Sequence, residues 1–235
     1  MPKIHVCLTP ALINLFDLSN KRVVVTDVLR ATSAMVTGLA HGVASIRPVT
    51  TAEEAKRWED LGYQGAAERD GKVVEGFSFG NSPFAYMGEE VKGKKIALTT
   101  TNGTKAIQLS DGALEILAAG FVNLESTVAY CAKFQEDVLV HCAGWKDQFN
   151  IEDTLFAGAM VYHLEKEGFH CADDAGMAAK MLYEQTKNDL FGFLKNSSHY
   201  HRLARLGIER DIEYCLQENV VNVVGVIKNG ELVSA

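Results

Sequence analysis

The stretch "IALTTTNGTKAIQL", Ile96–Leu109, contains the change of pattern that decides the fold. It begins as an apolar run typical of a buried strand and ends with the spacing of an amphipathic helix. Threonines, an asparagine and a glycine separate the two runs. A strand, a short polar loop and a helix in this order are typical of a β-α unit, which belongs to a sheet of parallel strands.

The same alternation continues along the chain. Runs typical of strands occur at 21–28, 43–49, 63–68, 94–100, 113–120 and 136–144, and helical patterns at 30–42, 51–62, 102–112 and 123–135. Helical segments follow at 151–168 and 173–189, and Asn229-Gly230 is predicted to form the turn of a terminal hairpin. We therefore predict an α/β fold, a mostly parallel sheet covered by helices on both faces in three layers, with a helix-rich C-terminal part. No linker divides residues 1–235, which predicts a single domain.

The composition of the chain argues against several classes of protein. A chain of 235 residues that is 47% hydrophobic can bury a sizeable core, and a net charge of -7 without a block of Lys or Arg argues against nucleic acid as a partner. No apolar run has the length of a signal peptide or a membrane span, so we expect a cytoplasmic protein without a membrane partner. The 5 scattered cysteines suggest neither a disulfide framework nor a zinc site.

The loop after the strand at 94–100 is the first candidate site, because ligands of parallel sheets gather at the carboxyl ends of the strands. It offers the hydroxyl groups of Thr100, Thr101 and Thr104, and unpaired backbone N–H groups near Gly103 at the start of a helix. Such a helix start favours an anion. The alternative is a simple helix cap formed by Thr101 or Asn102.

The loop "DVLRATS", residues 27–33, is the second candidate. Asp27 follows a buried strand, and Arg30 stands in the first turn of a helix, where a cation opposes the helix dipole. A carboxylate that can hold a divalent metal beside a guanidinium that can grip phosphate is suited to phosphoryl transfer. The alternative is a structural ion pair in which Asp27 caps the helix.

Two further loops add carboxylates. In residues 66–83, Glu68 and Glu75 are candidate metal ligands or acid–base groups, whereas Arg69 and Asp70 also fit a solvated surface cluster. The same loop ends at Asn81-Ser82, where Ser82 is expected to cap a second helix that begins at a proline.

Glu152 and Asp153 lie in the first turn of the helix at 151–168, where the dipole favours acids in any case. Their interest lies in sharing a cleft with Asp27 and Glu68, which would gather enough oxygen ligands for Mg²⁺. His199 and His201 stand two residues apart in a helical context and cannot share one helical face, so we expect them at the surface.

Four motifs together carry a resemblance. The segments "DVLRATS", "ERDGKVVEGFSFGNSP", "TTTNGTKA" and "CAGWKDQFNIEDTLFAG", in this order, resemble the 2-phosphosulfolactate phosphatase (ComB) family over essentially the whole chain. The resemblance implies a family-specific α/β fold and a magnesium-dependent acid phosphatase. It also implies hydrolysis of 2-phosphosulfolactate to 3-sulfolactate and phosphate, a step toward coenzyme M.

We therefore predict an enzyme that hydrolyses a small phosphate ester with several anionic groups and uses Mg²⁺. Direct attack by water is our hypothesis, because no Ser–His or Cys–Arg nucleophile pattern is evident, and a phosphoenzyme on Asp27 is the alternative. Other readings are a magnesium-dependent enzyme for another phosphorylated hydroxy acid and a non-catalytic anion-binding protein. The oligomeric state stays open, although a homodimer is common for enzymes of this size. The predicted catalytic residues are Asp27, Arg30, Glu68 and Glu75, the metal ligands Asp27, Glu68, Glu152 and Asp153, and the substrate-binding residues Asn81, Ser82, Thr100, Thr101, Asn102, Gly103, Thr104 and Lys105.

Overall fold

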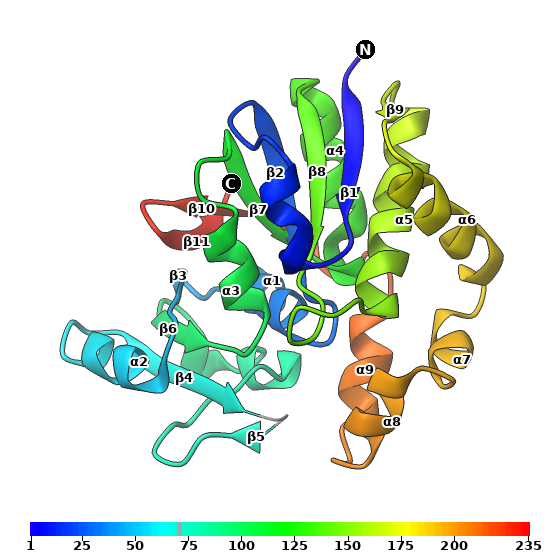
Figure 1. Cartoon of the computed structure of the whole chain (residues 1–235). Helices are drawn as coiled ribbons and strands as arrows, with labels where there is room; N and C mark the ends of the chain where they lie inside the picture. The colour runs from blue at the N-terminus through cyan, green and yellow to red at the C-terminus, as the bar shows by residue number, and fades with distance from the viewer. Residues whose placement is uncertain (70–71) are drawn as a thin grey trace.

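The computed structural model describes residues 1–69 and 72–235, and the strands in these ranges form one sheet (Figure 1). The strand order is β5-β4-β6-β3-β11-β10-β7-β2-β8-β1-β9. The strands are β1 (Lys3–Cys7), β2 (Lys21–Thr26), β3 (Ser45–Pro48), β4 (Gln64–Arg69), β5 (Lys72–Val73), β6 (Lys95–Thr99), β7 (Glu115–Ala119), β8 (Asp137–Cys142), β9 (His170–Cys171), β10 (Gly225–Lys228) and β11 (Glu231–Ser234).

Helices cover both faces of this sheet (Figure 1), so the prediction of a three-layer α/β fold is confirmed. The α-helices are α1 (Ala31–Ala40), α2 (Ala52–Glu59), α3 (Gly103–Leu109), α4 (Leu124–Phe134), α5 (Ile151–Lys166), α6 (Asp174–Thr186), α7 (Leu190–Leu194), α8 (Ser198–Ala204) and α9 (Glu209–Cys215). Short 3-10 helices are η1 (Pro10–Leu15), η2 (Pro83–Tyr86), η3 (Glu89–Val91) and η4 (Phe121–Asn123).

Strand β2 shows how the sequence builds the layers. Successive side chains of a strand point to opposite faces. Val24 accordingly packs into the core that contains Phe156 of α5, whereas Val23 and Val25 pack into the core that contains Met35 of α1. A strand buried on both faces needs a continuous apolar run rather than an alternating one, which is the pattern of its sequence.

The sheet contains two blocks of parallel strands. One block is β4-β6-β3 and the other is β7-β2-β8-β1-β9, and the hairpin β10-β11 lies between them. The hairpin strands are antiparallel to each other and to both of their neighbours, β3 and β7. The two parallel blocks consequently run in opposite directions across the sheet.

The terminal hairpin is confirmed, and its turn has the expected geometry. Asn229 and Gly230 have φ values of 53° and 76°, the left-handed conformation that a two-residue type I′ turn requires. Strands β1, β5 and β9 were not among the runs predicted as strands. The helix expected after Ser82 is the four-residue 3-10 helix η2, and the Ser82 side chain makes no capping hydrogen bond. In the part of the chain that is described, no helix has the length and apolar character needed to cross a membrane.

Candidate active site

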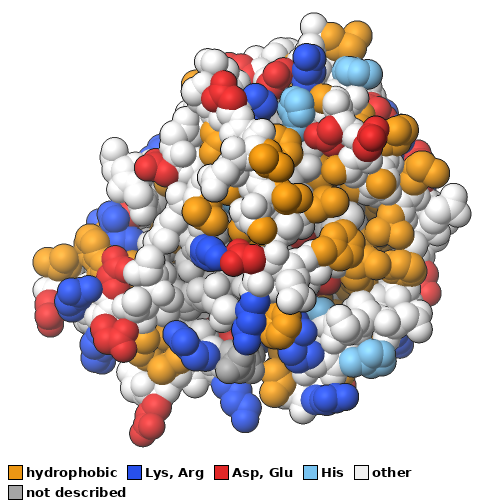
Figure 2. Space-filling model, in the orientation of Figure 1, with side chains coloured by type: hydrophobic (Ala, Val, Ile, Leu, Met, Phe, Trp, Pro, Cys, Tyr) orange, Lys and Arg blue, Asp and Glu red, His pale blue; other side chains and the backbone are white. Residues whose placement is uncertain are grey.

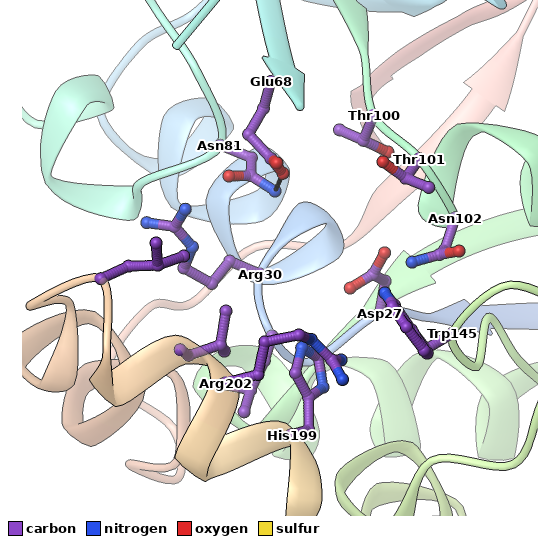
Figure 3. Close-up of a pocket in the computed structure, with 13 residues that line it drawn as sticks. Asp27, Arg30, Glu68, Asn81, Thr100, Thr101, Asn102, Trp145, His199 and Arg202 are labelled. Carbon is purple, nitrogen blue, oxygen red and sulfur yellow. Dashed lines mark hydrogen bonds between the residues drawn. The ribbon is translucent and has the colours of Figure 1, made fainter. Parts of the chain in front are cut away.

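A cavity of about 260 Å³ opens where the loops after β2, β4 and β6 meet the C-terminal helix α8 (Figure 3). Seven of the residues predicted for the site line it, namely Asp27, Arg30, Glu68, Asn81, Thr100, Thr101 and Asn102. The other described lining residues are Leu29, Trp145, His199, Arg202, Leu203 and Leu206.

Asp27 lies directly after β2, and only 7% of its surface is exposed. Its Oδ1 atom accepts a long hydrogen bond from the backbone N–H of Ala31, at 3.4 Å. Burial raises the pKa of Asp27 to about 6, the nearby charge of His199 opposes that rise, and the carboxylates of Glu68 and Glu152 add to it. A carboxylate with such a raised pKa inside a cavity is a candidate functional group.

Gly103 brings the loop after β6 against Asp27. A Cβ atom at position 103 would lie 2.9 Å from Oδ2 of Asp27 and 2.7 Å from the Cβ atom of Ala31. Both separations are too short for any side chain, so this approach of backbone to carboxylate requires glycine. Two segments far apart in the sequence therefore meet at one cavity.

The threonine loop is held together by its own hydrogen bonds. Thr104 Oγ1 donates to the carbonyl of Thr100 at 2.9 Å, and the Thr104 N–H donates to Thr100 Oγ1 at 3.2 Å. The side chain of Thr104 is therefore turned into the loop, and its amide already has a partner. The hydroxyl-bearing side chains that line the cavity from this loop are those of Thr100 and Thr101.

Asn102 and Lys105 have partners in the loop after β8. Asn102 Oδ1 accepts a hydrogen bond from the backbone N–H of Lys146 at 3.0 Å. The exposed Lys105 forms an ion pair with Asp147 at 2.7 Å and does not line the described cavity. The two loops are thereby fastened to each other beside the cavity.

Glu68 and Asn81 form a second oxygen-bearing corner. Asn81 Nδ2 donates to Glu68 Oε2 at 2.7 Å, and this orients the amide so that Asn81 Oδ1 is buried without a hydrogen-bond partner among the described residues. Ser82 lines an adjacent hollow rather than the main cavity. Glu75 is exposed and does not line the described part of the cavity. Asp70 lies outside the described residues.

Arg30 is buried and its guanidinium forms an ion pair with Asp211 of α9. Arg30 also lines the cavity, so a guanidinium, which carries five N–H donors, stands at the wall of the site. The pair also connects the site to the C-terminal helices.

The Asp153 carboxyl group accepts hydrogen bonds through both of its oxygen atoms. Its Oδ1 accepts from the backbone N–H of Val28 and its Oδ2 from that of Gly144, each at 2.9 Å. Burial, together with the charges of Glu152 and Asp27, raises the pKa of Asp153 well above its usual value. In this position the carboxyl group fastens the loop after β2 to the loop after β8.

His199 was expected at the surface, and this expectation was wrong. The residue is 7% exposed, lines the cavity and pairs through Nδ1 with the buried carboxylate of Glu152. His201 is exposed, as expected. The pairing occupies Glu152 Oε1, so the assignment of Glu152 and Asp153 as metal ligands stays a prediction.

The oxygen atoms of the cavity decide which metal would fit. Within the described ranges, no cluster of three or more His, Cys, Asp and Glu side chains is arranged to hold an ion. The cavity offers the carboxylates of Asp27 and Glu68 and the unpartnered Oδ1 of Asn81. Hard oxygen donors suit Mg²⁺, which keeps several waters and needs only one or two carboxylates when phosphate oxygens complete its shell. The donor set fits Mg²⁺ better than zinc.

Six described lining residues were not predicted from the sequence, and three of them, Trp145, His199 and Arg202, have polar or aromatic side chains. Trp145 belongs to the loop after β8, a strand end of the type that marked the other candidates, and that position could have drawn attention to it. His199 and Arg202 come from α8, and nothing in the pattern of a seven-residue helix marks it as part of a site.

Figure 2 shows Lys and Arg side chains gathered on the lower part of this face of the molecule, despite the net charge of -7. Such a distribution favours the approach of an anion.

Comparison with known proteins gives a consistent result. The sequence model of a family described as 2-phosphosulpholactate phosphatase matches residues 7–230. A protein of Thermotoga petrophila named "Probable 2-phosphosulfolactate phosphatase" is 42% identical over 207 residues, which cover 88% of this chain and 89% of that protein. Proteins with the same name from Caldanaerobacter subterraneus and Clostridium acetobutylicum are each 37% identical. These alignments cover 93% of this chain and 92% of the Caldanaerobacter protein, and 92% and 93%, respectively, for the Clostridium protein. This chain belongs to the 2-phosphosulfolactate phosphatase family.

Proposed function

We propose that this protein is a magnesium-dependent phosphatase that hydrolyses 2-phosphosulfolactate to 3-sulfolactate and inorganic phosphate, the reaction type used in coenzyme M biosynthesis. The names of its relatives support the choice of substrate. The observation that carries the chemistry is the position of Asp27, a buried carboxylate pressed against Gly103 in a cavity that also contains Glu68 and Arg30.

The charges of the cavity support a role for both a metal and an arginine. A phosphate ester approaching Asp27 and Glu68 would be repelled by two carboxylates unless a cation stood between them. Mg²⁺ held by Asp27 and Glu68, with Asn81 Oδ1 as a further donor, would neutralise charge on the phosphate as the ester bond breaks. Arg30 would bind phosphate oxygens through guanidinium N–H groups, for which its planar fork is suited.

The remaining residues would orient the reacting groups. Thr100 and Thr101 offer hydroxyl donors to the phosphate from the opposite side of the cavity, and Asp27 would orient the attacking water. Held in one cavity, these groups would contribute by positioning and by electrostatics, which account for most of the catalysis of phosphoryl transfer. Direct attack by water is favoured because no activated serine or cysteine lines the described cavity. Recovery of a covalent phosphoaspartate after rapid quenching would instead establish Asp27 as a nucleophile.

The test is phosphate release from 2-phosphosulfolactate, measured with Mg²⁺ and with EDTA, for the natural protein, Asp27→Asn and the control Asp111→Asn. Asp111 is exposed and does not line the described cavity. We expect metal-dependent release that falls by about 10²- to 10³-fold in Asp27→Asn, the size of loss found when an electrostatic group of an active site is removed. The control should retain full activity.

Two results would reject the proposal. Ligand binding without any turnover would indicate a non-catalytic anion-binding protein. Equal rates on 2-phosphosulfolactate, 2-phospholactate and phosphoglycolate would show that the sulfonate is not read and that the enzyme acts on phosphorylated hydroxy acids in general.

A further inference from the structure

Arg202 is the second guanidinium of the cavity, and the proposed chemistry does not use it. It lies on α8, at the side of the cavity that faces away from Thr100 and Thr101 (Figure 3). Arg30, the other arginine, is anchored by its ion pair with Asp211. The two ends of the cavity are therefore chemically different, with hydroxyl groups at one end and Arg202 at the other.

One nitrogen atom of the Arg202 guanidinium is buried and has no hydrogen-bond acceptor among the described residues. This atom, Nη2, is inaccessible to solvent. Burial lowers the pKa of Arg202, and the charge of Glu152 partly offsets this effect. Burying an N–H donor of a cation without an acceptor is costly. Arg202 also lines the cavity, so a small movement of the guanidinium toward an anionic oxygen there would give Nη2 an acceptor.

Trp145 holds this guanidinium in place. The guanidinium carbon of Arg202 lies 3.9 Å from the centre of the indole ring, a stacked arrangement that restricts the side chain and favours a cation. Lys146 and Asp147 both have left-handed φ values, 52° and 62°, and form a two-residue turn between Trp145 and Gln148. Backbone hydrogen bonds in both directions between Trp145 and Gln148, at 2.9 and 3.0 Å, close this turn and fix the position of the residue that carries the ring. The bond from Lys146 N–H to Asn102 fixes this loop to the phosphate side of the cavity.

We propose that Arg202, held against Trp145, binds the anionic group of the substrate that is not transferred. It would thereby select phosphate esters that carry a carboxylate or sulfonate beside the ester carbon. This assignment rests on the proposed phosphatase function, because it assumes that the phosphate lies at the Asp27 and Thr100 side. The cavity of about 260 Å³ has room for a small phosphate ester, and Thr100, Thr101 and Arg202 all line it, so both anionic ends of such a substrate can contact protein at once. A guanidinium bound to one of them fixes the distance and direction of the phosphate at the other.

The kinetic test compares Arg202→Gln with Arg205→Gln, a matched control at the exposed end of the same helix. The substrates are 2-phosphosulfolactate, 2-phospholactate and isopropyl phosphate, which carry two, one and no anionic groups besides the phosphate. Arg202→Gln is expected to lower kcat/KM on 2-phosphosulfolactate by about 10- to 100-fold, the effect of losing a charge-assisted hydrogen bond, and to leave isopropyl phosphate hydrolysis unchanged. A similar loss on 2-phospholactate assigns the carboxylate to Arg202, and a smaller one assigns the sulfonate.

An equal loss on all three esters would overturn the proposal, since Arg202 would then act on the phosphate or on the fold. No loss on 2-phosphosulfolactate would overturn it as well. Arg202→Lys keeps the charge and the apolar stem but not the planar fork, so it is expected to lose part of the selectivity. It serves as the test variant if melting curves show that Arg202→Gln does not fold.

A binding experiment separates this proposal from the phosphatase function. Calorimetry with sulfoacetate and with inorganic phosphate needs no turnover. Arg202→Gln should weaken sulfoacetate binding by about 10- to 100-fold and leave phosphate binding unchanged. If the natural protein hydrolyses none of the esters, the phosphatase function fails, while the sulfoacetate result still decides the role of Arg202. Equal affinity of the variant and the natural protein for sulfoacetate would overturn the assignment.

Discussion

Replacement of Asp27 by asparagine should stabilise the metal-free protein at alkaline pH while removing its activity. Asp27 is buried, and its carboxylate lies close to two others, those of Glu68 and Glu152. Asparagine has nearly the same shape, keeps an oxygen that can accept the N–H of Ala31 and carries no charge. The substitution therefore removes a buried charge without leaving a hole.

The size of the gain follows from the pKa of Asp27. Burial raises this pKa from 3.8 to about 6, a difference of about two units, and each unit corresponds to about 1.4 kcal/mol. Because the pKa is raised, the native state binds more protons than the unfolded state between these two values. Ionisation of Asp27 therefore does not lower the free energy of unfolding below pH 3.8, lowers it increasingly as the pH rises, and has its full effect above about pH 6. We expect Asp27→Asn to raise the free energy of unfolding by about 3 kcal/mol at pH 8 and by about half of that at pH 5.

Urea denaturation in EDTA at the two pH values measures this gain, with Asp111→Asn as the exposed control, expected to change stability by less than about 0.5 kcal/mol. Adding Mg²⁺ should stabilise the natural protein and have little effect on Asp27→Asn, because binding to the native state alone stabilises it. A variant no more stable than the natural protein at pH 8 would refute the buried-charge argument. So would a gain of equal size at both pH values.

Three further substitutions test the surroundings of this carboxylate. Asp153→Asn should lose about 1 to 3 kcal/mol in urea denaturation at a pH low enough that the raised pKa of Asp153 leaves its carboxyl group uncharged, because no buried charge is then removed while an amide NH₂ replaces one acceptor of two buried backbone N–H groups; unchanged stability would contradict that role. Gly103→Ala should lower kcat/KM by about 10²-fold, because the Cβ atom of the alanine would displace the Asp27 carboxylate, while the protein stays folded in a melting curve. Full activity of this variant would show that the contact is dispensable. His199→Leu should lose about 3 to 5 kcal/mol in urea denaturation by leaving the Glu152 carboxylate buried without its partner, and a stability equal to that of the natural protein would exclude a structural pair.

The positions of the strand-end residues could be predicted because their signals are local. The apolar run before Asp27 marks the buried strand β2, and the threonines after Ile96 mark the end of another strand, β6. Both features lie within a few residues of the side chains concerned. Glu68 follows the same logic at the end of β4. The direction in which a loop side chain points is not local, so Glu75 was grouped with Glu68 although it is exposed.

The residues that α8 contributes could not be predicted. A seven-residue helix has too few positions for its period to show which face is buried, and the partners of His199 and Arg202 lie 47 or more residues away in the sequence. His199 becomes buried because Glu152 lies opposite it, and Arg202 lines the cavity because Trp145 lies beneath it. Each of these pairs is a tertiary contact that cannot be predicted from the local sequence of either segment.

The carboxyl ends of β2 and β6 meet for a reason that could not be predicted from the sequence. The prediction assumed parallel strands whose carboxyl ends share one edge, but the hairpin β10-β11 makes the blocks of β6 and β2 run in opposite directions. In a flat sheet, Asp27 and Gly103 would then lie at opposite edges. Five pairings separate β6 from β2, and a twist of about 20° to 25° at each adds up to roughly 100° to 125°. Subtracted from a reversal of 180°, this twist leaves the two strand directions about 55° to 80° apart. Both carboxyl ends therefore point toward a common region, and the contact between Gly103 and Asp27 is the result. The C-terminal hairpin and the sheet twist together create the site, although the hairpin contributes no side chain to its described lining.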